Sequence, residues 1–127
     1  MKLDYGGIGM DSTDAKVLAE LLKANSTVQQ LDAKSNGLRA AGAKAVGDML
    51  KTNNTLILLD LSDNEIGGYG PSYDFKATPE GPAALADGLK ANLSVQQLDV
   101  SANGLGVDGG KAIAASIAES STITSVS

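Results

Sequence analysis

A repeated eleven-residue segment constrains this chain more than any other feature of its sequence. VQQLDAKSNGL at residues 28–38 returns as VQQLDVSANGL at residues 95–105, and LILLDLSDNEI at residues 56–66 keeps the same pattern between them. The last residues, ITSVS at 123–127, match the start of the segment. The four starting points are 28, 39 and 28 residues apart. A fixed period of this length predicts a stack of similar structural units, with one unit enlarged.

Each copy opens with alternating apolar and polar residues, which predicts a short strand with one face in the core. The residues expected to point inward are Leu31 and Ala33, Leu59 and Leu61, and Leu98 and Val100. In the second half of each copy, apolar residues recur at i, i+3, i+4 and i+7, which predicts a helix that pairs large with small residues. The predicted inward faces are Ala15, Leu18, Ala19 and Leu22; Ala43, Val46, Gly47 and Leu50; Pro82, Leu85, Ala86 and Leu89; and Gly110, Ile113, Ala114 and Ile117.

The alternation of strand and helix defines the expected fold class. Stacked strand–helix units predict an α/β protein in the form of a right-handed βα solenoid, with a parallel inner sheet and an outer layer of helices. We expect residues 1–127 to form one domain of about four repeats and a final strand.

The strand half of each copy follows the pattern L-x-x-L-x-L-x-x-N-x-L, with conservative variants. Together with the phrases GAKAVGDMLKTNNTLILLDLSDNEIG and LADGLKANLSVQQLDVSANGLG, it resembles the ribonuclease-inhibitor-like leucine-rich-repeat proteins. The resemblance covers the whole chain except one insertion. That family includes nuclease inhibitors, innate immune sensors, activators of small GTPases and actin-filament capping proteins. The resemblance therefore implies a rigid curved surface that binds other proteins.

Two columns of asparagines recur at fixed positions in the repeat. Asn36, Asn64 and Asn103 follow the strands, where an inward amide satisfies the backbone of the turn, so we interpret them as structural. Ile8 takes this position in the first copy, whose turn must be closed differently. The second column, Asn25, Asn53 and Asn92, forms N-x-S/T sequons just before the strands. Because all three share one repeat position, turn formation explains them better than glycosylation does.

The concave face of the sheet is the first candidate binding surface. Aspartates occupy one column along it, where they are either ordinary family residues or part of a surface for a basic partner or a cation. Leu58 is an apolar residue in a column that otherwise holds polar ones. The candidate partner-binding residues on this face are Leu58, Gln30, Asp32, Lys34, Asp60, Gln97 and Asp99, and Asp4 continues the aspartate column.

The second candidate surface is an insertion at about residues 68–79, within the segment GGYGPSYDFKATPEGP. It enters between a strand and its helix, at the rim formed by the carboxyl ends of the parallel strands, where long loops tend to be functional. It holds three of the four aromatic residues, Tyr69, Tyr73 and Phe75. Either these side chains contact a partner or they fold back to cover the loop itself. After the insertion, Thr78 is expected to cap the next helix, with Gly81 as the alternative cap.

The composition excludes several classes of function. The chain has no histidine and no cysteine, so the commonest general base, metal ligand and thiol nucleophile are missing, and we expect no enzyme, metal or cofactor. The net charge of −5 offers no basic stripe for nucleic acid. No signal peptide and no membrane span are recognised, so an intracellular, cytoplasmic protein is expected.

The sequence thus predicts a non-enzymatic scaffold for protein–protein interaction. Two alternatives stay open: a regulator of a small GTPase, by resemblance to the activator members of the family, and a structural subunit of a larger assembly. The strands at Leu3 and Val126 carry no recognisable terminal cap. Uncapped ends favour a piece of a longer array, docking in a complex, or end-to-end self-association.

Overall fold

Five short parallel strands form one sheet. In the computed structural model, which describes residues 1–127, they are β1 (Lys2–Asp4), β2 (Gln30–Asp32), β3 (Leu58–Asp60), β6 (Gln97–Asp99) and β7 (Ser125–Val126). They pair in the order β1-β2-β3-β6-β7 and keep a single register. One inward row across the sheet is therefore formed by Leu3, Leu31, Leu59, Leu98 and Val126.

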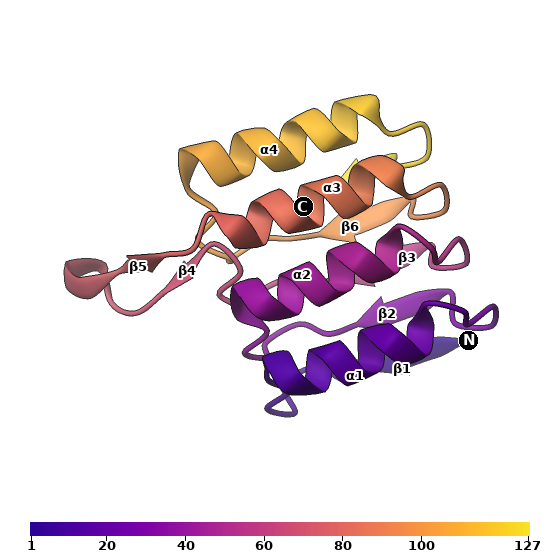
Figure 1. The fold of residues 1–127 in the computed structure, drawn as a ribbon, viewed down its shortest axis with the longest axis horizontal. Helices are drawn as coiled ribbons and strands as arrows, with labels where there is room; N and C mark the ends of the chain where they lie inside the picture. The colour runs from indigo at the N-terminus through magenta and orange to yellow at the C-terminus, as the bar shows by residue number, and fades with distance from the viewer.

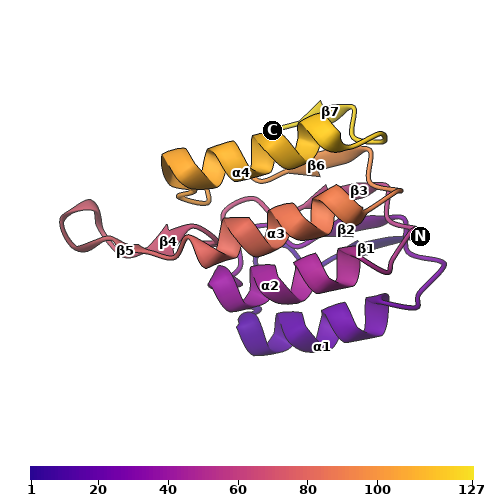
Figure 2. The same cartoon turned by 45° about the horizontal axis from the view of Figure 1, so that its top comes forward.

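Four helices form a second layer: α1 (Ser12–Leu22), α2 (Arg39–Leu50), α3 (Glu80–Ala91) and α4 (Gly106–Glu119). Each helix lies between two successive strands of the sheet and packs against its neighbours in the series. Figures 1 and 2 show the helices side by side in chain order, all on the same side of the sheet. The predicted right-handed βα solenoid with a parallel inner sheet and outer helices is confirmed.

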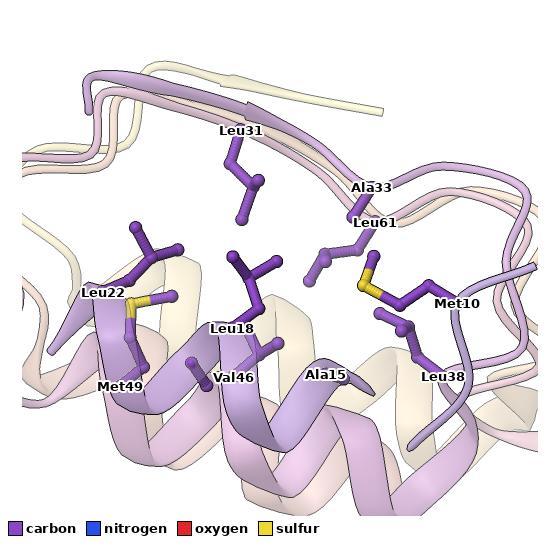
Figure 3. Close-up of a pocket in the computed structure, with 11 residues that line it drawn as sticks. Met10, Ala15, Leu18, Leu22, Leu31, Ala33, Leu38, Val46, Met49 and Leu61 are labelled. Atoms are coloured by element: carbon purple, nitrogen blue, oxygen red, sulfur yellow. The ribbon is translucent and has the colours of Figure 1, made fainter. Parts of the chain in front are cut away.

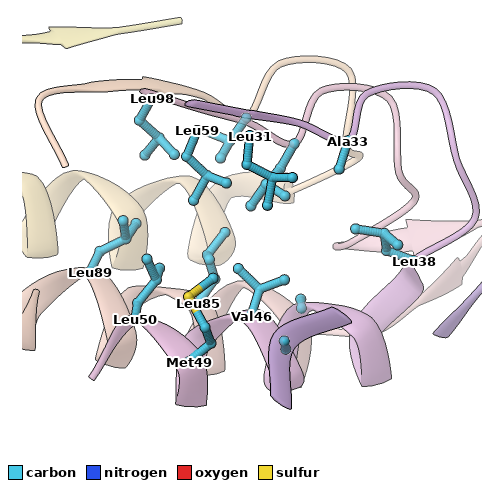
Figure 4. Packing of buried hydrophobic residues seen from close by; sticks show 14 of the residues in the cluster. Leu31, Ala33, Leu38, Val46, Met49, Leu50, Leu59, Leu85, Leu89 and Leu98 are labelled. Carbon is cyan, nitrogen blue, oxygen red and sulfur yellow. The ribbon is translucent and has the colours of Figure 1, made fainter. Parts of the chain in front are cut away.

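The core lies between the two layers. Figure 4 shows Leu31, Leu59 and Leu98 pointing from three neighbouring strands toward apolar side chains of α2 and α3. All six strand residues that were predicted to point inward are buried. The inward faces predicted for α2 and α3 are buried throughout, and their small residues let these two helices approach each other closely.

The inward faces predicted for the two outer helices are wrong in part. On α4, Ala114 is exposed and Gly110 is half-buried, whereas Gly109 and Ser116 are buried. On α1, Leu18 is only half-buried. Both helices have a neighbouring helix on one side alone. The buried face of α1 and of α4 is therefore narrower than that of the inner helices, and it is turned toward the one neighbouring helix.

The asparagines that follow the strands hydrogen-bond the backbone of two repeats at once. The side-chain nitrogen of Asn103 donates to three backbone carbonyls, and its side-chain oxygen accepts from two backbone N–H groups. Because these groups belong to its own repeat and to the preceding one, a single side chain joins two neighbouring repeats. The partners are Leu61, Val100, Ser101, Asn64 and Ile66, at 2.8 to 3.3 Å.

This arrangement explains how the first copy tolerates Ile8 in place of asparagine. The backbone N–H groups of Ile8 and Met10 donate to the side-chain oxygen of Asn36, at 3.2 and 2.9 Å. The side-chain nitrogen of Asn36 also donates to the carbonyl of Tyr5 at 2.9 Å. The first turn is therefore closed by the asparagine of the next repeat.

The sequon asparagines form a second column at the opposite rim, where each helix turns into the next strand. Asn53 and Asn92 are buried. The side-chain nitrogen of Asn92 donates to the carbonyls of Leu50 and Asn53 at 3.0 and 2.7 Å, and its oxygen accepts from two backbone N–H groups of its own turn. In the last copy, the hydroxyl of Ser120 accepts the equivalent bonds. A glycan on Asn53 or Asn92 is incompatible with this buried bonding.

The helices begin in different ways. At α1, Asp11 and Asp14 form a reciprocal capping box, and the backbone N–H of Asp14 lowers the pKa of the Asp11 carboxyl. The prediction that the Thr78 side chain caps α3 is wrong. The Thr78 hydroxyl donates to the carbonyl of Ile66 at 3.1 Å, and α3 begins at Glu80 after Pro79 without a side-chain cap. The hydroxyl therefore ties the end of the insertion to the rim instead.

A small apolar cavity of about 10 Å³ remains between the first two repeats. Figure 3 shows that Ala33, which directly follows β2, and Leu18 of α1 are among the residues around it. The positions equivalent to Ala33 in the next two repeats hold Leu61 and Val100, so the backbone accepts a branched residue there. The cavity is therefore a local packing defect that follows from one small residue.

Substituting Ala33→Val is expected to raise the free energy of unfolding by about 0.5 to 1 kcal/mol, because it buries more apolar surface beside the cavity at a position where the next two repeats already carry Leu61 and Val100. Urea unfolding followed by circular dichroism measures the change. Ala43→Val is the matched control, since Ala43 is equally buried but does not line the cavity. This control should lower stability by overpacking. A loss of stability in both variants would show that the cavity cannot accept the extra volume.

Candidate protein-binding surface

The sheet face that points away from the helices, here called the open face, corresponds to the predicted concave surface. The strand register places Gln30, Leu58, Gln97 and Ser125 in one row across it. Leu58 is half-buried by its neighbours. A shallow hollow of about 200 Å³ lies over β3, β6 and β7. Its floor includes Leu58 and Gln97, so one apolar side chain lies among polar ones near the middle of the sheet.

The aspartates Asp4, Asp32, Asp60 and Asp99 form a second row, in register along the same face. In each, one carboxylate oxygen accepts a hydrogen bond from the backbone N–H two residues later, at 3.0 or 3.1 Å. The row thereby shapes the turn that leaves each strand. No group of three or more acidic, histidine or cysteine side chains lies close enough together to hold a metal ion.

Three of the four aspartate carboxylates also interact with the side chain of the residue two positions later in the chain. The hydroxyls of Ser62 and Ser101 donate to Asp60 and Asp99 at 2.7 and 2.6 Å. At the third such position, the exposed Lys34 places its ammonium group 3.7 Å from Asp32. The charge of the aspartate row is therefore partly compensated within the chain.

The insertion forms an antiparallel hairpin, here called the hairpin arm (residues 68–77). It consists of β4 (Gly68–Tyr69), a short 3₁₀ helix (Ser72–Asp74) and β5 (Lys76–Ala77). Figures 1 and 2 both show the arm projecting outward from one rim of the solenoid, without folding back over the helices or the sheet. The arm is therefore a separate feature from the open face.

The base of the arm packs on the solenoid through two of its aromatic residues. The guanidinium of Arg39, at the start of α2, lies 4.0 Å from the centre of the Tyr69 ring. Phe75 covers Gly68 and Gly104 so closely that a Cβ on Gly104 would lie 3.2 Å from the Phe75 ring. An arginine stacked on an aromatic ring contributes about 0.5 to 1 kcal/mol at exposed sites. These contacts hold the arm at its base.

The three aromatics of the arm do not form one cluster. Tyr69 is half-buried and Phe75 is 42 % exposed at the base, whereas Tyr73, in the 3₁₀ helix of the loop, is 91 % exposed. Sequence analysis missed Arg39, which the fold places beside Tyr69 although the two are thirty residues apart. The only signal was that Arg39 is the sole arginine of the chain. Their contact depends on the stacking of the repeats.

The stacked strand–helix repeats and their repeating hydrogen bonds make this chain similar to the leucine-rich-repeat proteins. The family model described as "Leucine Rich repeat" matches residues 52–70 and 91–114. A solved structure described as "Leiomodin-1 Actin-Binding Site 2 (ABS2)" superposes with a TM-score of 0.78 at 22% sequence identity, over 98% of this chain and 68% of that chain. A comparison with curated proteins finds no significant match.

None of the four helices combines the length and the apolar character that crossing a bilayer requires.

Proposed function

We propose that this chain is a non-catalytic protein-binding scaffold that contacts its partner through the open face and the hairpin arm. We also propose that it belongs to the ribonuclease-inhibitor-like subclass of leucine-rich-repeat proteins, with residues 1–127 as one domain; the 28-residue period supports this. Such a surface binds by shape and by a few strongly contacting residues, because its scaffold is rigid.

The observation that carries the proposal is the exposure of Tyr73. A tyrosine brings a large contact area at a low cost in side-chain entropy, and it is common at the centre of protein interfaces. Tyr69 and Phe75 are already used by the base of the arm, so Tyr73 is free to contact another molecule. An arm anchored by Arg39 keeps that ring at a fixed position relative to the solenoid.

The open face supplies the second part of the proposed surface. Leu58 offers apolar area at the middle of the sheet, and Gln30 and Gln97 flank it with amide groups that both donate and accept hydrogen bonds. Asp60, Asp99 and the exposed Lys34 surround these residues with charge, mostly negative, whereas Asp32 is buried and paired with Lys34. The partner is therefore expected to present a basic or amide-rich patch around an apolar residue.

Tyr73→Ser is expected to weaken binding of the partner by about thirtyfold, as for the loss of a central interface tyrosine. The partner is first captured from the native cell and identified, and binding is then measured by calorimetry with purified proteins. Leu58→Gln, which restores the residue type of the neighbouring repeats, should weaken binding to a smaller extent.

Val107→Ser is the control, because Val107 is an exposed apolar residue on α4, outside both proposed surfaces. The melting temperature of Tyr73→Ser and Val107→Ser should stay within about 3 °C of the parent, since each replaces an exposed residue, and circular dichroism verifies that Leu58→Gln, at a half-buried position, is folded. Unchanged affinity in Tyr73→Ser and Leu58→Gln would refute the proposed surface.

Actin binding is a second candidate function, favoured by the likeness to the leiomodin-1 domain, which is described as an actin-binding site. Cosedimentation with filaments and fluorescence titration of monomeric actin test it directly. Saturable binding that Tyr73→Ser weakens would assign actin as the partner. No binding at about 100 μM actin would remove this candidate and leave the general proposal in place.

Two further alternatives, a regulator of a small GTPase and a structural subunit of an assembly, make different predictions. A regulator of a small GTPase should stimulate nucleotide hydrolysis in a purified assay, whereas a scaffold should not. A structural subunit should copurify in fixed stoichiometry with its assembly, whereas a transient binder should exchange.

A further inference from the structure

The end of the solenoid formed by β1 and α1 presents an unpartnered apolar surface, here called the N-terminal end face. It is centred on Tyr5, Ile8, Val17 and Leu21. Ile8 is 64 %, Val17 59 % and Leu21 71 % exposed. Asp14 is the one charged side chain in the hollow that these residues line. Between the other repeats, the equivalent surfaces are covered by the neighbouring repeat.

Strand β1 also leaves backbone hydrogen-bonding groups unpaired. On either side of β1, the N–H of Tyr5 donates to the carbonyl of Asp32 and the carbonyl of Met1 accepts from the N–H of Gln30, so the odd-numbered residues along this edge bond to β2. Because these groups alternate along a strand, the N–H and C=O groups of Lys2 and Asp4 point to the free edge. This edge is a template for a further strand.

The side chains of β1 select the kind of strand that fits this edge. Lys2 and Asp4 flank Leu3 and both lie on the open face, and Lys2 makes no ion pair within the chain. When a second β1 approaches antiparallel with the two Leu3 residues opposite each other, Lys2 of each copy faces Asp4 of the other. The same register brings together the outward backbone groups of Lys2 and Asp4 as hydrogen-bonded pairs.

We propose that the N-terminal end face binds a second copy of this chain in a two-fold symmetric dimer. Antiparallel β1 strands form its seam, and Val17 and Leu21 of the two α1 helices cover each other beneath it. The residue sequence Lys-Leu-Asp is self-complementary in this register, as an isologous interface requires. Strand β7, at the other end of the sheet, carries no charged side chain and lacks this complementarity.

The dimer extends the open face into one sheet with a single antiparallel seam. Because the strands of the two copies run in opposite directions, the two hairpin arms project from opposite rims. A dimer of this form presents two equivalent binding surfaces, related by the two-fold axis, to a repeated or elongated partner. The dimer itself does not depend on the proposed function, since its seam is the edge of β1 and the exposed side of α1; only the two equivalent binding surfaces rest on that function.

The test is sedimentation equilibrium over a wide concentration range, with charge reversal at the seam. Lys2→Glu alone and Asp4→Lys alone place like charges opposite each other, and each should raise the dimer dissociation constant by about tenfold or more. An equimolar mixture of the two variants restores both opposite-charge pairs, so it should form heterodimers with nearly the parent affinity. In the antiparallel register the mixture only regains the affinity of the parent. In a parallel register the parent would set Lys2 against Lys2 and Asp4 against Asp4, so the mixture would associate more tightly than the parent.

Leu21→Glu tests the helix layer and should abolish the dimer, whereas Leu93→Glu changes an equally exposed leucine outside the interface and should leave it intact. Circular dichroism verifies that every variant is folded. A parent chain that stays monomeric at millimolar concentration would overturn the proposal. So would a dimer that survives Leu21→Glu, or variant mixtures that associate no better than the single variants.

Discussion

Asn103→Ala should lower the free energy of unfolding by about 3 to 5 kcal/mol, because it removes hydrogen bonds to five buried or partly buried backbone groups and offers no replacement. The side chain is only 2 % exposed, so water cannot take over these bonds without opening the turn. The affected groups belong to two repeats, so the substitution weakens both turns and their junction. Chemical denaturation at equilibrium measures the loss.

Asn54→Ala is the matched control for this prediction. Asn54 is exposed, makes no side-chain hydrogen bond and lies beside the buried Asn53. Its replacement should change stability by less than about 0.5 kcal/mol. If Asn103→Ala proved as mild as the control, the asparagine column would contribute little to stability, and its recurrence would need another cause.

Gly88→Ala is expected to destabilise the protein by about 3 kcal/mol, although alanine normally favours a helix over glycine by about 1 kcal/mol. α2 and α3 cross at Gly47 and Gly88. A Cβ on Gly88 would lie 2.6 Å from the Cα of Gly47 and still closer to its carbonyl oxygen. Backbone atoms cannot turn aside as a flexible side chain does, so the two helices would have to separate.

Gly110→Ala, in contrast, is expected to stabilise the protein. Gly110 lies within α4, and no atom would come within 4 Å of an added Cβ. The intrinsic helix preference should therefore act alone and raise stability by about 0.5 to 1 kcal/mol. Thermal unfolding of the two variants under the same conditions measures the expected loss of stability in Gly88→Ala and the expected gain in Gly110→Ala. Equal gains in Gly88→Ala and Gly110→Ala would mean that α2 and α3 are not closely packed at this crossing.

Most of the fold follows from the repeat. The register of Leu31, Leu59 and Leu98 was predictable because equivalent residues of a solenoid must align. Burial on α2 and α3 was predictable for the same reason. The errors fall on α1 and α4, since a sequence period treats every copy as equal while the end helices have a neighbour on one side only.

The sequence predicted where the insertion lies in the fold, but it did not predict how the aromatic side chains of the insertion are arranged. Counting the period located the insertion at one rim, and the structure makes it a hairpin. The separation of Tyr73 from Tyr69 and Phe75 depends on packing against Arg39 and Gly104, which come from other repeats. No local pattern in the insertion reports contacts of that kind.

The sequence alone determined the strand–helix unit, its period and the place of the insertion, because these depend on local alternation and on residues that recur at fixed spacing. Only the tertiary structure decided which groups meet across repeats: Asn36 hydrogen-bonds the turn at Ile8, and Arg39 stacks on Tyr69. It also decided which surfaces stay uncovered, Tyr73 on the arm and Leu21 at the N-terminal end face. Contact and exposure depend on the neighbours that stacking supplies, and a linear period does not encode them.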